Sequence, residues 1–131
     1  MRKVLIAALL ASCGGKPPPQ PPKAPNTELI VGEFERHPPD GTTAMRFRAS
    51  GDYEVAKTKD ALDATLAASG KFALDGDQLT FTQTKGPCVD LHAPVGVYKV
   101  VISKVGIHFA KVSDECGDKR KLDGQTWWRI K

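Results

Sequence analysis

Hydrophobic and polar residues alternate with a period of two over most of the chain after residue 28. This alternation is typical of β-strands that bury one face, and Gly, Asp and Pro clusters interrupt it where turns are expected. The pattern predicts eight short strands, at residues 29–36, 43–49, 53–58, 70–74, 78–84, 95–103, 106–112 and 126–130. Only residues 59–69 are predicted to form a helical turn or an ordered loop.

The predicted strands are joined mostly by short links, which favour antiparallel pairing between neighbours in the sequence. Eight such strands with an apolar inner face predict an all-β fold, an antiparallel up-and-down eight-stranded barrel that leaves no exposed edge. The predicted outer face carries charged residues such as Glu33, Lys71 and Lys99. Transmembrane barrels need an apolar outer face and strands of about 9–11 residues, so this class is excluded.

A repeated phrase supports the barrel: GDYEV begins at Gly51, GKFAL at Gly70 and GVYKV at Gly96. The aromatic and aliphatic residues of each phrase are two positions apart and therefore share one face. We predict that this face points inward, together with Met45, Val55, Leu74, Leu79, Val100 and Ile107. The candidate ligand-binding residues are the interior aromatics Phe47, Tyr53, Phe72, Phe81, Tyr98 and Phe109. An eight-stranded barrel either fills with side chains or holds one small ligand, and both alternatives stay open.

The first residues follow another pattern, in which Arg2 and Lys3 precede a short apolar run at 4–10. The run is too short to span a bilayer and is typical of a secretory signal peptide. Residues 10–13, Leu-Ala-Ser-Cys, resemble the bacterial lipobox. The resemblance implies cleavage before Cys13, lipid attachment to Cys13 and a membrane anchor. Gly14, in place of an aspartate, favours the outer membrane of the cell envelope.

The expected organisation is therefore a lipoprotein signal peptide at 1–12, a tether at 13–28 and a barrel domain at 29–131. Residues 16–26 contain six prolines, which exclude helix and sheet and favour an extended polyproline spacer. Of the 19 Lys and Arg residues, four precede Glu28, which leaves 15 against 15 Asp and Glu from Glu28 onward. This formal neutrality argues against a nucleic-acid partner.

With Cys13 assigned to the lipid, Cys88 and Cys116 remain as a pair. An exported protein meets an oxidising environment, so we predict a disulfide between them. The same cysteines, with Asp90, His92 and Asp114, could instead be drawn as a metal site, but the spacing is not that of a zinc motif. The three histidines lie in unrelated contexts and no nucleophile or phosphate-binding motif stands out, so we expect no metal, no cofactor and no enzymatic activity.

The chain resembles the small bacterial lipocalin-like (calycin) barrels over about residues 29–131. The resemblance rests on the phrases VGEFER, MRFRASGDYEV, SGKFALDGDQLTFTQTKGPC, GVYKVVISKVGIHFAKVSDEC and RKLDGQTWWRI. The Gly-x-Trp that opens this family appears here as Gly32-Glu33-Phe34. The resemblance implies an arginine stacked on that aromatic ring, with Arg129 as the candidate and Arg120 behind it. It also permits a ligand cavity, although it does not specify the ligand.

Two functions follow as expectations. In the first, a membrane-anchored barrel binds a small apolar or amphipathic ligand. In the second, the barrel core is filled and the lipoprotein binds or inhibits an envelope protein. Trp127 and Trp128 are adjacent, so on a strand they face opposite ways, and an exposed tryptophan would indicate a partner surface.

Overall fold

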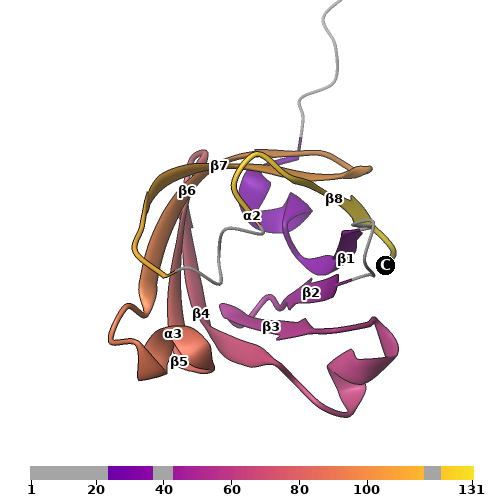
Figure 1. Ribbon diagram of the computed structural model, residues 1–131. Helices are drawn as coiled ribbons and strands as arrows, with labels where there is room; N and C mark the ends of the chain where they lie inside the picture. Colours follow the sequence, from indigo (N-terminus) through magenta and orange to yellow (C-terminus); the bar gives the residue numbers. More distant parts are fainter. Residues whose placement is uncertain (1–23, 37–42, 117–121) are drawn as a thin grey trace, which may run out of the picture.

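The computed structural model describes residues 24–36, 43–116 and 122–131. Eight antiparallel strands follow one another around a closed barrel in the order of the sequence, as predicted (Figure 1). They are β1 (Gly32–Arg36), β2 (Thr43–Phe47), β3 (Asp52–Ala56), β4 (Ala68–Asp75), β5 (Gln78–Lys85), β6 (Val95–Ile102), β7 (Gly106–Asp114) and β8 (Thr126–Arg129). Three short helical segments complete the described fold, namely α2 (Asn26–Leu29), the 3-10 turn η1 (Asp60–Asp63) and α3 (Pro87–Asp90).

The predicted strand at 29–36 is wrong in its first three residues. Residues 26–29 form helix α2, whose first turn is anchored by the Pro25 carbonyl, which accepts the backbone N–H groups of Glu28 and Leu29. Strand β1 therefore starts at Gly32. The alternation missed this helix because a single turn is too short to display a helical period. The other seven strands begin and end within two residues of the predicted positions.

The repeated phrases face inward as predicted. Strand pairing places Tyr53 opposite Phe47, Phe72 opposite Phe81, and Tyr98 opposite Leu79. All twelve predicted interior residues belong to one hydrophobic core or pack directly against it. Trp127 and Trp128 face opposite ways, with 1% and 49% of their surfaces exposed.

Gly70 explains why a glycine precedes the aromatic residue in β4. The strand bends there, with a register shift between Ser69 and Gly70, so that it pairs with both β3 and β5. A Cβ atom at Gly70 would lie 2.2 Å from the Thr82 carbonyl oxygen. Only glycine permits this close approach of the two backbones.

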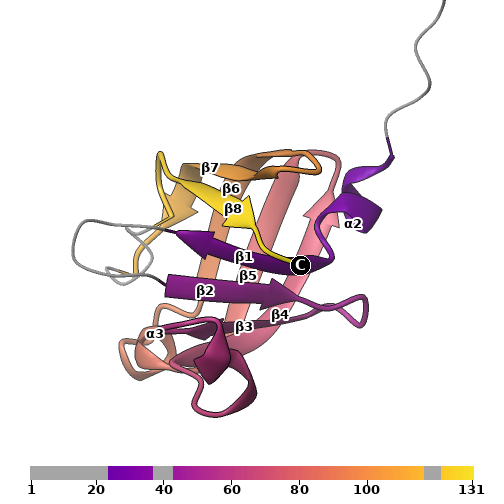
Figure 2. The same cartoon turned by 90° about the vertical axis from the view of Figure 1, so that its right-hand side faces the viewer.

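One end of the barrel is closed by α2 and by the short turns that join β2 to β3, β4 to β5 and β6 to β7 (Figure 2). The Asn26 side chain donates a hydrogen bond to the Gly76 carbonyl oxygen in the β4–β5 turn, at 2.9 Å. Ile30, which follows α2, is fully buried. The opposite end carries the longer connections and α3, and we refer to it as the open end.

Arg129 connects the elements at the closed end. Its guanidinium lies 4.6 Å from the centre of the Phe34 ring, which confirms the stacking implied by the family resemblance. It also donates hydrogen bonds to four backbone carbonyl oxygens, one at the end of α2, one in the α2–β1 link and two in the β6–β7 turn: those of Leu29, Val31, Ser103 and Lys104. In the described chain the β1–β8 ladder has two residue pairs, which backbone hydrogen bonds between Glu33 and the residues Ile130 and Lys131 extend. Arg129 adds side-chain contacts to this short seam.

We expect Arg129→Lys to lower the free energy of unfolding by about 2 kcal/mol, because lysine keeps the charge but loses the planar set of donors. Urea denaturation measures the change. Arg48→Lys is the matched control, since Arg48 is half exposed, and it should shift stability by less than about 0.5 kcal/mol. Equal small effects from both variants would contradict this role for Arg129.

On the outer wall, Arg46 holds η1 against the barrel. Its guanidinium contacts Glu33 at 2.9 Å, Glu54 at 3.0 Å and Asp63 at 2.6 Å, and the residue is only 8% exposed. Burial alone would lower the pKa of Arg46, but its hydrogen bonds to the three carboxylates raise it above the ordinary value. Beside this network, Leu62 of η1 packs on Ala44 and Ala56.

We expect Arg46→Met to cost about 3 kcal/mol, because it removes the ion-pair partner of the partly buried Glu33 carboxylate. Arg48→Met, which removes another partner of Glu54 from an exposed position, should cost less than about 1 kcal/mol. Arg46 lowers the pKa of Asp63, so the Arg46–Asp63 ion pair stabilises the fold at neutral pH. This stabilisation is lost as the pH falls through the lowered pKa of Asp63. Urea denaturation at several pH values should therefore show the Arg46→Met penalty shrinking in acid, and a constant penalty would contradict this account.

Candidate functional site

The barrel interior divides into a packed half and a half with free space. In the packed half, the Phe47 ring centre lies 5.1 Å from that of Phe72 and 6.0 Å from that of Phe34. Phe81 lies between the halves, with ring centres of Tyr53 at 4.9 Å and Tyr98 at 5.9 Å. These rings pack edge-on against one another, so the filled-core alternative describes the interior of this half of the barrel.

The open half contains a cavity of about 170 Å³. Its walls come from residues of β2, β3, β4, β5 and β8 and from the connections at the open end. The lining residues are Thr43, Met45, Tyr53, Val55, Ala56, Lys57, Ala67, Ala68, Phe81, Gln83, Pro87, Leu122 and Trp127. Of the six candidate ligand-binding aromatics, Tyr53 and Phe81 line the cavity, whereas Phe47, Phe72, Tyr98 and Phe109 do not.

Two polar groups in the cavity wall are buried without a hydrogen-bond partner among the described residues: the Tyr53 hydroxyl and the Trp127 indole Nε1. Tyr53 is 2% exposed and Trp127 is 1% exposed. A buried polar group without a partner costs about 1–3 kcal/mol, so a ligand that supplied an acceptor would gain by pairing with these groups. Tyr53 and Trp127 are both lining residues of this cavity.

Gln83 lies beside these groups and is fixed from the other side. Its Oε1 accepts the backbone N–H groups of Cys88, at 2.7 Å, and Val89, at 3.3 Å. Burial raises the pKa of Tyr53 to about 12, and the nearby Gln83 amide lowers it only in part. The Tyr53 hydroxyl and this amide do not meet the geometry of a hydrogen bond. The Tyr53 phenol is therefore protonated at neutral pH and can donate.

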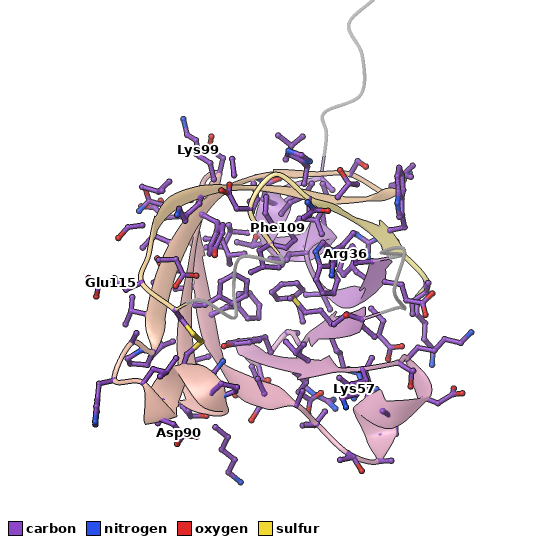
Figure 3. All side chains as sticks on the ribbon, viewed as in Figure 1. Arg36, Lys57, Asp90, Lys99, Phe109 and Glu115 are labelled. Carbon is purple, nitrogen blue, oxygen red and sulfur yellow. A yellow bond between two sulfur atoms is a disulfide. The ribbon has the colours of Figure 1, made fainter. Side chains whose placement is uncertain are left out.

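Arg36 stands at the rim of the cavity. It shares the inner face of β1 with Phe34 and pairs with Thr43, a lining residue. Continuing the β1–β8 register by one residue places it opposite Trp127. Figure 3 draws Arg36 and Phe109 within the ring of strands, whereas Lys99, Asp90 and Glu115 lie outside it. The Arg36 Nε is buried and has no hydrogen-bond partner among the described residues.

Tyr98 differs from Tyr53 because its hydroxyl is already used. It donates to Oδ2 of Asp114 at 2.5 Å, and burial together with this carboxylate raises the pKa of Tyr98 far above its ordinary value. The other oxygen of Asp114 accepts the backbone N–H of Cys116 at 3.0 Å. Tyr98 thus serves as a structural hydrogen-bond donor in the β6–β7 wall.

The predicted disulfide between Cys88 and Cys116 is confirmed, with a Cα–Cα distance of 5.4 Å. It joins α3 to the segment that follows β7, and its yellow bond is visible at the edge of the barrel in Figure 3. Together with the hydrogen bonds to Gln83, it fixes α3 and therefore Pro87, one of the cavity walls. Both sulfurs are consumed in this bond and cannot act as thiolate ligands.

Within the described ranges, no three His, Cys, Asp or Glu side chains are placed to hold a metal ion. His108 lies on the outer face, where its Nδ1 is 2.8 Å from the Thr126 hydroxyl. Cys13, the predicted lipidation site, and Arg120 lie outside the described residues.

Sequence reasoning missed Arg36, Gln83 and Leu122 as residues at or near the cavity. A signal was present for the first two, because Arg36 follows Phe34 by two positions and Gln83 follows Phe81 by two. On a strand this spacing places a polar side chain on the buried face. Leu122 carries no such signal, since it lies outside the strands.

The fold and the site define a closed, sequentially wound β-barrel with a small apolar cavity at one end. Comparison with protein-family models, with curated proteins and with solved structures finds no match for this chain. Among the described helices, none has the length and apolar character needed to cross a bilayer.

We expect removal of the disulfide by Cys88→Ala with Cys116→Ala to lower the free energy of unfolding by about 3.5 kcal/mol, on the chain-entropy account of the loop that it closes. Urea denaturation of the oxidised protein and the double variant measures the difference. The unmodified protein with a reducing agent is the control and should show the same shift. A loss of less than about 1 kcal/mol would contradict this contribution.

Proposed function

We propose that this chain is a lipoprotein of the cell envelope whose barrel binds one small, largely apolar ligand in the cavity at its open end. The observation that carries the proposal is the cavity of about 170 Å³, whose apolar wall contains two buried and unpartnered polar groups. An apolar cavity of about 150 Å³ can hold a benzene molecule, so this volume suits a ligand of one ring. The barrel then acts as a binding protein rather than an enzyme.

The location rests on the sequence. The basic start, the apolar run and the lipobox-like residues 10–13 support export, lipidation of Cys13 and anchoring, with the outer membrane favoured. The disulfide agrees with an oxidising compartment. Kinship with lipocalin-like barrels is part of the same proposal, and the strand order and the stacking of Arg129 on Phe34 support it.

A second function, binding or inhibition of an envelope protein, is favoured by one observation on the outer wall. Trp128 is 49% exposed, and Val105, next to its partner Gly106, is 62% exposed. Large exposed aromatic residues are enriched at protein interfaces. In-cell crosslinking should then capture a specific protein with the unmodified chain and lose it with Trp128→Ala, and identical recovery from both would count against this function.

The ligand-binding proposal predicts that full-length protein purified gently from its own envelope retains a small molecule, seen as a mass difference by native mass spectrometry. Ala68→Leu should abolish the retained mass, because its larger side chain fills the cavity. The matched control is Ala73→Leu on the exposed face of the same strand, which should keep it.

Circular dichroism and the melting temperature establish whether both variants fold. If Ala68→Leu does not fold, Ala68→Val fills the cavity with a smaller side chain. Protein that retains nothing and shows no thermal shift with any ring-sized apolar compound would overturn the proposal. Equal retention by the Ala68 and Ala73 variants would place the ligand elsewhere.

A further inference from the structure

The polar groups around the cavity are donors, and this bears on the chemistry of the ligand. The Trp127 indole N–H can only donate, and it is buried without a partner among the described residues. A ligand that pairs with this N–H must bring an acceptor to it. A purely hydrocarbon ligand would leave it unpaired.

Neighbouring groups point to the same requirement. The Tyr53 hydroxyl keeps its proton at neutral pH and has no partner within the described structure. The Oε1 of Gln83 already accepts two backbone N–H groups, so its amide nitrogen can only add further donors.

The charges at the rim are positive. Lys57 lines the cavity, and Arg36, next to Thr43 on the inner face, has a buried Nε without a partner among the described residues. The described lining residues include neither Asp nor Glu. Asp114 is close enough to influence Tyr53, but its two oxygens accept from the Tyr98 hydroxyl and the Cys116 backbone N–H. An anionic ligand would thus gain charge-assisted hydrogen bonds here.

The volume limits the rest of the ligand. Pockets for drug-sized molecules occupy about 300–1,000 Å³, and this cavity has about 170 Å³. Phe81 forms its floor and is packed between Tyr98 and Phe109, which prevents a long chain from passing deeper. One six-membered ring with a small substituent fits this space.

We infer that the cavity recognises a ring-sized monocarboxylate, whose oxygens accept from the buried Trp127 and Tyr53 donors while Arg36 and Lys57 balance its charge. This inference rests on the proposed function and specifies the ligand class of the same site. It excludes long acyl chains and ring-sized compounds without an acidic group as preferred ligands.

Isothermal titration of full-length protein in detergent tests the inference with four probes at pH 7. Benzoate is the expected ligand, benzamide is its neutral isostere, toluene lacks any acceptor, and hexadecanoate keeps the carboxylate on a long chain. We expect benzoate to bind at least tenfold more tightly than each of the other three.

The preference should depend on the named donors. Tyr53→Phe removes the hydroxyl, and Arg36→Gln removes the positive charge. Each variant should lower the ratio of benzoate affinity to toluene affinity by at least fivefold. Trp127→Phe tests the indole in the same way, and its melting temperature establishes that it folds. Trp128→Phe on the outer face is the matched control and should leave the ratio unchanged.

The outcomes separate the two proposals. Equal binding of benzoate, benzamide and toluene would overturn the carboxylate preference and leave ligand binding in place. Tighter binding of hexadecanoate would overturn the size limit and indicate a lipid ligand. Binding of none of the four probes would overturn the inference together with the proposed function.

Discussion

The seam between β1 and β8 is the constraint on which the rest of the barrel depends. A sheet that curls into a barrel must join its first and last strands, and here the described ladder consists of the pairs Phe34–Arg129 and Glu35–Trp128. Backbone hydrogen bonds between Glu33 and the residues Ile130 and Lys131 extend it. Arg129 strengthens this short ladder by stacking on Phe34 and binding carbonyl oxygens from two other connections. Its guanidinium is partly desolvated, which lowers its pKa, but the carbonyls supply the acceptors that burial removes.

The contacts that support this seam make the two ends of the barrel different. Arg129, α2 and the short turns gather at one end, so the aromatic residues nearest to them pack against each other without free space. The longer connections collect at the other end, where side chains from α3 and the loops only partly cover the interior. The free volume therefore lies where the seam and its supporting contacts exert the least constraint.

The sequence predicts this fold well because one signal dominates it. Residues such as Phe72 and Leu74 alternate with exposed Lys71 and Ala73, and that spacing fixes which face each side chain takes. Alternation says nothing about depth along the barrel axis. Phe47 and Tyr53 are directly opposite each other and carry the same signal, yet only Tyr53 reaches the cavity.

Depth is decided by the tilt of the strands and by the loops at each end, which involve residues far apart in the sequence. This is why Leu122 could not be predicted as a cavity wall. The helix α2 escaped prediction for a different reason, since one turn that follows a proline-rich segment resembles the end of a spacer.

The position of α2 shows at which end of the barrel the described chain enters. The described chain enters the fold beside Gly76, at the end opposite the cavity, so the segment before residue 24 joins the barrel at its closed base. The entry of the chain and the opening of the cavity are therefore separated by the length of the barrel.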